Sequence, residues 1–170
     1  DKAVSGSVSS YKGAGYDILL DMNPSFGVDA LSGLNVYVGG SHTDADGQVG
    51  VVKQADHEEG IAGIIFALGP VKAGYMRSIE MPGQESAGTT SYYQNDAFGV
   101  SFNINDDLSI SYGEMESTKH MTNATGNNKR ITTADSIQLA YSMGGMSIKI
   151  AESSVDDATY ANGGTGSDFD

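Results

Sequence analysis

The 170-residue sequence contains no cysteine, no tryptophan and only 3 prolines. Without cysteine the chain forms no disulfide and no thiolate metal site, and cysteine usage gives no clue to its compartment. The sequence also lacks an apolar run near the roughly 18 to 20 residues of a membrane-spanning helix, and it shows no helical period. A membrane-spanning β-strand needs only about 9 to 11 residues with alternate ones apolar, so these absences leave a membrane location open.

Positive charge is scarce as well, because 9 lysines and arginines stand against 22 aspartates and glutamates, a formal net charge of -13. A nucleic-acid-binding surface needs clustered lysine and arginine to neutralise phosphates. No such cluster occurs, so we expect no nucleic-acid partner. The acidic residues gather in predicted loops, where a solvated acidic surface is the simplest explanation.

The stretch FGVSFNINDDLSISY, residues 98–112, alternates apolar residues with small or polar ones on both sides of an Asn-Asp-Asp cluster. A period of two places every second side chain on the same face of a strand. Asn and Asp tolerate left-handed backbone and bond their own chain, so the cluster predicts a tight turn. The stretch is therefore a predicted β-hairpin, and residues 136–150 repeat the pattern around Gly144-Gly145.

The same alternation predicts further strands over residues 16–22, 34–38, 61–68 and 71–76, and a short one over 49–53. We expect an all-β fold, an antiparallel up-and-down meander of about eight strands. Short and long connections alternate along it. The short connections lie at 69–70, 105–107 and 144–145, and the long ones around 40–59, 79–96 and 115–131.

A transmembrane β-barrel has short turns at one end and long loops at the other, a segregation that a soluble β-sandwich does not need. One face of a barrel strand meets lipid and the other lines the interior. The predicted lipid-facing residues share the apolar parity: Phe98, Val100, Phe102, Ile104, Leu108, Ile110, Tyr112, Ile137, Leu139, Tyr141, Ile148 and Ile150. The predicted pore-lining residues lie on the polar parity: Asp17, Asp21, Lys72, Ser101, Asn103, Ser109, Ser111, Gln138 and Lys149. Tyr112 and Tyr141 are also candidates for an interfacial aromatic girdle, with ordinary strand propensity as the alternative.

The segments NDDLSISYGE (residues 105–114) and SIQLAYSMGGMSIKIAE (residues 136–152) resemble the last strands of general bacterial porins of the alphaproteobacterial type. The resemblance extends over most of residues 60–152. It implies a sixteen-stranded barrel, usually a homotrimer, in the bacterial outer membrane. Its surroundings would be membrane lipid and lipopolysaccharide, and ions and small hydrophilic solutes would cross it by passive diffusion.

On this basis we interpret residues 1–170 as a single β-barrel segment, the C-terminal half of a porin without its final strand. Both ends of the segment are then expected on the external side. The alternative function is a soluble β-rich binding module, a lectin-like or adhesin-like sandwich whose apolar face packs on a second sheet.

Few residues suggest a site of another kind. Asp44-Ala45-Asp46-Gly47 resembles the start of an oxygen-rich calcium loop, which makes Asp44 and Asp46 candidates for a structural Ca²⁺, with a plain acidic loop as the alternative. No metal-binding spacing joins the histidines, so we expect them to be surface residues. No catalytic motif occurs, and we expect no enzymatic activity and no other cofactor.

Overall fold

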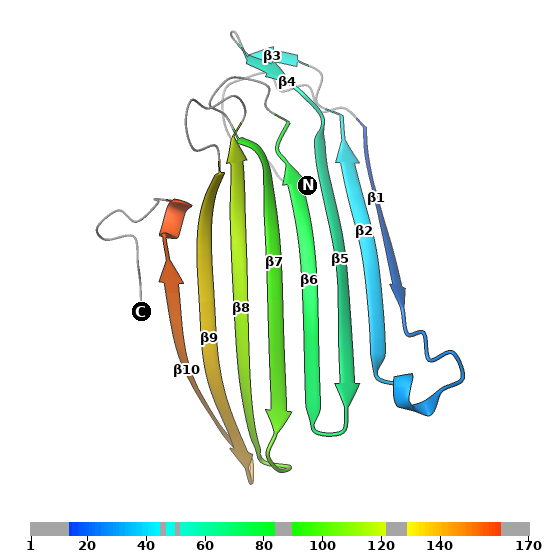
Figure 1. Cartoon of the computed structure of the whole chain (residues 1–170), viewed down its shortest axis with the longest axis vertical. Helices are drawn as coiled ribbons and strands as arrows, with labels where there is room; N and C mark the ends of the chain where they lie inside the picture. The colour runs from blue at the N-terminus through cyan, green and yellow to red at the C-terminus, as the bar shows by residue number, and fades with distance from the viewer. Residues whose placement is uncertain (1–13, 45–46, 50–51, 84–89, 122–128, 161–170) are drawn as a thin grey trace.

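The computed structural model describes residues 14–44, 47–49, 52–83, 90–121 and 129–160. It is an all-β structure in which one antiparallel sheet carries a small hairpin at one end (Figure 1). The large sheet has eight strands: β1 (Gly15–Met22), β2 (Leu34–Thr43), β5 (His57–Leu68), β6 (Val71–Met81), β7 (Thr90–Asn103), β8 (Leu108–Met121), β9 (Lys129–Met143) and β10 (Met146–Asp156). The remaining elements are the hairpin of β3 (Gly47–Val49) and β4 (Val52–Gln54) and the 3-10 helices η1 (Asp29–Leu31) and η2 (Ala158–Tyr160).

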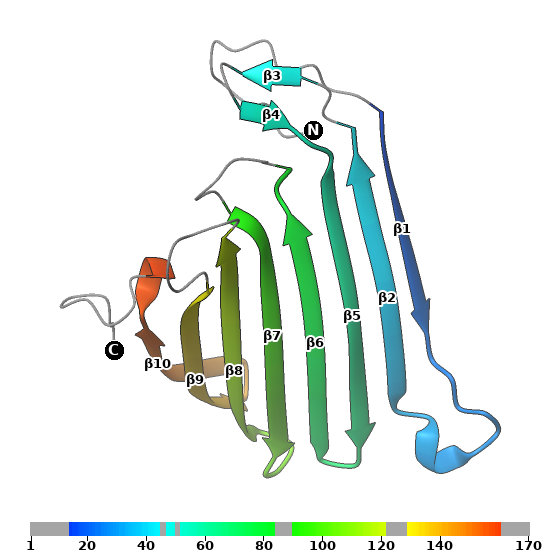
Figure 2. The same cartoon turned by 45° about the horizontal axis from the view of Figure 1, so that its top comes forward.

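The large sheet is a meander, because its spatial order is β1-β2-β5-β6-β7-β8-β9-β10. Each strand pairs with the next strand of that sheet along the chain, and the β3–β4 hairpin is inserted between β2 and β5. This confirms the predicted antiparallel arrangement of eight strands. Figure 2 shows that the sheet is a single curved layer, with β9 and β10 bending away from the plane of β1 and β2.

The tight turns lie together at what we call the turn end of the sheet, residues 69–70, 104–107 and 144–145. Gly144 and Gly145 both have positive φ, 55° and 87°, as a two-residue hairpin turn of type I′ requires. The Asn105 side-chain oxygen accepts hydrogen bonds from the backbone N–H groups of Asp107 and Leu108, both at 2.9 Å, which closes the predicted Asn/Asp turn. The connection over residues 23–33 also lies at the turn end but is longer, so the alternation of loop lengths is not strict there.

The opposite end of the strands, which we call the loop end, has shorter connections than the sequence predicted. β7 begins at Thr90, β8 continues to Met121 and β9 begins at Lys129, so the strands extend into segments that were assigned to long loops. These extensions are polar on both faces and carry no hydrophobic alternation. They remain strands because neighbouring backbones pair and satisfy each other's N–H and C=O groups, as Gln94 does opposite Thr118.

The sheet has no conventional core. Within the residues that the structure describes, no hydrophobic side chain is buried, and the buried side chains are those of Ser117 and Thr118. No helix in this part of the chain is long and apolar enough to cross a lipid bilayer. The apolar side of the sheet is therefore not covered by any described element.

Candidate functional site: the two faces of the sheet

One face of the large sheet carries a continuous apolar band next to the turn end, and we call it the outer face. Directly opposed residues of antiparallel strands lie on the same face, so the register identifies its members. Phe102, Ile110, Leu139 and Ile150 form one row across β7 to β10. The register puts the predicted lipid-facing residues of the strands on this face, and Ile104 follows β7 directly.

The band continues over the other half of the sheet, where sequence analysis had not listed lipid-facing residues. Ile64 and Tyr75 continue the row of Phe98 into β5 and β6. On the edge strand, Ile18 and Leu20 are 71% and 50% exposed. An apolar surface of this extent is unusual for a protein surrounded by water.

The outer face changes from apolar to charged along a line that runs obliquely across the strands. The first charged residue beyond the band is Glu58 in β5 and Glu152 in β10. Traced through the paired residues, the row of Glu152 meets β5 at Phe66, eight residues from Glu58 (66 minus 58). Eight residues at about 3.4 Å each displace the boundary by roughly 27 Å along the strands. The strand spacings from β5 to β10, at about 4.8 Å each, give a width of roughly 24 Å. The boundary is therefore inclined by about 48° to the rows of paired residues.

Tyrosines mark both edges of the band. Beside its charged edge, Tyr75 donates its hydroxyl hydrogen to Asp96, which also accepts a 2.7 Å bond from the Nε of Arg77. Tyr112 donates to Glu114 at 3.0 Å in the same way. Tyr141 instead lies next to the turn end. The two predicted girdle residues, Tyr112 and Tyr141, are therefore on opposite edges of the band.

The opposite face, which we call the inner face, is mainly polar and rich in small residues, although Leu19, Ile61 and Ile65 also belong to it. Lys72, Ser101, Ser111 and Gln138 form one row across β6 to β9. The register also puts the remaining predicted pore-lining residues on this face: Asp17, Asp21, Asn103, Ser109 and Lys149.

A charged row near the loop end of the inner face was missed by the sequence analysis. It pairs Asp17, Ser41, Glu59, Glu80, Tyr93, Lys119 and Arg130 in that order across β1 to β9. Its acids therefore lie on β1, β5 and β6 and its bases on β8 and β9. The parity of Glu80 with Lys72, and of Lys119 with Ser111, is visible in the sequence. The row was missed because these polar segments were assigned to loops.

The segment after β10 folds over the basic part of this row. The Tyr160 hydroxyl lies 2.7 Å from the Oγ of Ser117, and the Lys119 ammonium is 5.8 Å from the centre of the Tyr160 ring. Arg130 donates a hydrogen bond to the Tyr160 carbonyl oxygen at 3.4 Å, and the Thr132 hydroxyl donates to the Asp157 carbonyl oxygen at 2.8 Å. These bonds hold η2 against the inner face of β8 and β9.

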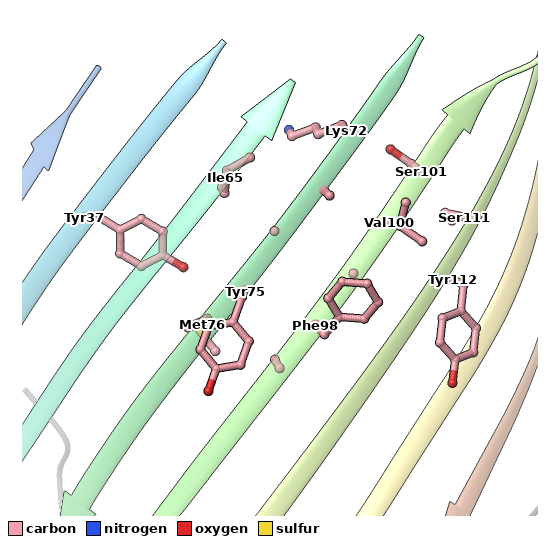
Figure 3. Close-up of a pocket in the computed structure, with 14 residues that line it drawn as sticks. Tyr37, Ile65, Lys72, Tyr75, Met76, Phe98, Val100, Ser101, Ser111 and Tyr112 are labelled. Carbon is pink, nitrogen blue, oxygen red and sulfur yellow. The ribbon is translucent and has the colours of Figure 1, made fainter. Parts of the chain in front are cut away.

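A shallow hollow of about 410 Å³ crosses β2, β5, β6, β7 and β8 (Figure 3). It opens where Gly74 and Gly99 face each other without side chains, and the ring of Tyr37 lies against Gly63 beside it. Its lining includes residues of both faces, because the sheet is one layer thick. A hollow this open does not enclose a ligand as a small-molecule pocket does.

Of the two candidate calcium residues, the structure describes Asp44 alone. Asp44 directs its Oδ1 to the Nε2 of His42 at 2.8 Å, and Asp46 lies outside the described residues. His42 is at the loop end of β2, beyond the apolar band, and its Nδ1 lies 3.3 Å from Glu58. The hydrogen bond to Asp44 and the further carboxylates raise the pKa of the His42 imidazole. His42 is thus surrounded by carboxylates, and its side chain is 22% exposed.

These features define a class of structure, an antiparallel meander sheet with one exposed apolar face and one charged polar face. No protein-family model matches the chain, and no curated protein matches it.

Proposed function

We propose that the chain forms part of the wall of an outer-membrane porin, a sixteen-stranded β-barrel through which ions and small hydrophilic solutes diffuse passively. In this proposal the outer face contacts the membrane lipid and lipopolysaccharide of a bacterial outer membrane, and the inner face lines the water-filled pore. The chain is then one segment of that barrel, the parent protein is a homotrimer, and transport requires no catalysis.

The oblique edge of the apolar band carries this proposal. In a membrane barrel the strands are tilted by about 35 to 45°, so the membrane plane crosses the rows of paired residues at that angle. The angle of about 48° derived from the register is close to this range. In a sandwich of aligned sheets the two strand directions lie within about 30° of each other, so a polar boundary there is expected to be less inclined to the rows.

The charge pattern of the inner face supports a pore that responds to ion charge. Asp17, Glu59 and Glu80 lie toward one side of the sheet, whereas Lys119 and Arg130 lie toward the other. Charged residues that line a channel bias which ions pass. The expected channel is weakly selective.

A pair of single-cysteine variants tests this proposal, because the natural sequence contains no cysteine to interfere. Ile110→Cys and Ser111→Cys are adjacent in β8 but belong to opposite faces. After reconstitution of the chain in lipid vesicles, we expect a water-soluble maleimide to label Ser111→Cys. We expect a fluorophore at Ile110→Cys to be quenched by quenchers attached to lipid tails.

The same variants in detergent-free buffer provide the control. A monodisperse protein whose Ile110→Cys thiol is protected without lipid would contradict the proposal and favour the soluble sandwich. Equal lipid quenching at both positions would also contradict it, because the two faces would then share one environment.

A further inference from the structure

We infer that His42, Asp44 and Asp56 form a binding site for a divalent transition metal, best suited to Zn²⁺, which joins the two ends of the long connection between β2 and β5. One ligand atom from each residue lies within 4.8 Å of the others. The site is on the outer face at the loop end, and it is independent of whether the sheet lines a pore.

The distances suit one small cation. The His42 Nε2 lies 2.8 Å from Asp44 Oδ1 and 4.0 Å from Asp56 Oδ2. Two ligand atoms that are each about 2.1 Å from a tetrahedral zinc are roughly 3.4 Å apart. The observed separations lie on both sides of that value, so small side-chain rotations bring the three atoms to coordination distance.

The second ring nitrogen of His42, Nδ1, fixes the orientation of the imidazole. Nδ1 of His42 faces the Glu58 carboxylate at 3.3 Å, and the ring of Tyr16 stacks on the imidazole with centroids 5.3 Å apart. With Nδ1–H donating a hydrogen bond to Glu58, a metal ion between Asp44 and Asp56 takes the place of the proton that Nε2 shares with Asp44, and that proton is released to solvent. A ligating histidine commonly gives its second nitrogen to a carboxylate in this way, which fixes its tautomer and orientation.

The donor set selects the type of metal. One imidazole nitrogen and two carboxylates suit zinc and neighbouring transition metals, whereas Ca²⁺ takes six to eight oxygen ligands. The side chains of His42 and Asp44 are 22% and 46% exposed, so an ion can reach them from solvent and water can complete the coordination.

Strand geometry explains why these residues meet. His42 and Asp44 are two residues apart, as are Asp56 and Glu58, so each pair projects to one face. The register puts His42 directly opposite Glu58. Asp44 directly follows β2 and Asp56 directly precedes β5. A metal bound between them would link the two ends of the connection between these strands.

Zinc titration of the full chain tests the site. The metal-stripped protein is titrated with Zn²⁺ by calorimetry and with Co²⁺ by visible absorption, and folding of each variant is checked by circular dichroism. We expect one saturable site per chain, a Co²⁺ spectrum typical of four or five ligands, and loss of both signals in His42→Gln and in Asp56→Asn. His120→Ala, which removes a distant histidine of β8, is the matched control and should bind like the natural chain.

Glu58→Gln separates positioning from ligation. We expect it to weaken Zn²⁺ binding by about 10- to 100-fold while one site per chain remains. Ca²⁺ at millimolar concentration should not displace Zn²⁺. The inference is overturned if binding is unsaturable, if Ca²⁺ displaces Zn²⁺, if His42→Gln binds normally, or if binding is lost instead in His57→Ala, whose ring belongs to a second group with Glu59 and Glu80.

Discussion

Single residues decide how closely the backbones of this thin sheet approach one another. Gly33 ends the connection between β1 and β2, and its carbonyl oxygen accepts a hydrogen bond from the Ala67 N–H at 2.9 Å. A Cβ added to Gly33 would overlap the Ala67 carbonyl oxygen. The contact is between backbones, which cannot move aside as a flexible side chain would.

Gly33→Ala should therefore destabilise the folded chain by about 1–3 kcal/mol, as overpacked substitutions do. The measurement is chemical unfolding of the reconstituted protein. Gly60→Ala is the matched control, because a Cβ there meets nothing within 4 Å, and its effect should stay within about 0.5 kcal/mol. Equal stability of the two variants would show that the connection can shift away from β5.

At the scale of elements, η2 covers part of the inner face. η2 is a short element held in a sparsely populated backbone conformation, with positive φ at Thr159 and Tyr160 and at Asp157 just before it. Non-glycine residues remain in that region only when their surroundings hold them there. Here the holding contacts come from Ser117, Lys119 and the neighbouring residues of β8 and β9, so η2 is fixed to the inner face of the sheet.

Tyr160→Ala removes the ring that covers Lys119 and the hydroxyl that bonds Ser117. If the inner face lines a pore, single-channel conductance in the full-length parent should rise, because the ring no longer covers the inner face and η2 loses part of the contacts that hold it there. Tyr160→Phe keeps the ring and should leave conductance near the parent value, at a stability cost of about 0.5–1.5 kcal/mol for the lost hydrogen bond. A conductance that falls in Tyr160→Ala would contradict this role for η2.

At the scale of the whole molecule, the proposed function gives the two faces two different environments. The chain has a formal net charge of -13, yet inner-face bases are gathered on β6 and on β8 to β10. The Debye length is about 10 Å at 0.1 M salt, so fixed charges act on passing ions most strongly in dilute salt.

If the inner face lines a pore, Lys72→Glu and Lys149→Glu should each shift the reversal potential of the full-length parent toward cation selectivity, measured across a salt gradient at low ionic strength. Each change replaces a positive wall charge by a negative one. Lys129→Glu in β9 makes the same change on the outer face, and it should leave the reversal potential nearly unaltered. If neither inner-face variant shifts the potential, Lys72 and Lys149 do not line the ion path.

Much of this architecture can be predicted from local sequence patterns. Alternation predicted all eight strands of the large sheet, and turn chemistry predicted the hairpins at Asn105 and at Gly144-Gly145. These features are local because a period of two and a left-handed turn involve only neighbouring residues.

Residues far apart in the sequence are brought together by strand register, and only the tertiary structure shows that register. Register aligned the oblique edge of the apolar band, paired the acids of β5 and β6 in one row with the bases of β8 and β9, and brought His42 beside Asp56 and Glu58. Alternation fixes the face of each residue. The register of two paired strands depends on turn geometry and on the summed backbone hydrogen bonds of the whole ladder. No single segment of the sequence contains that information.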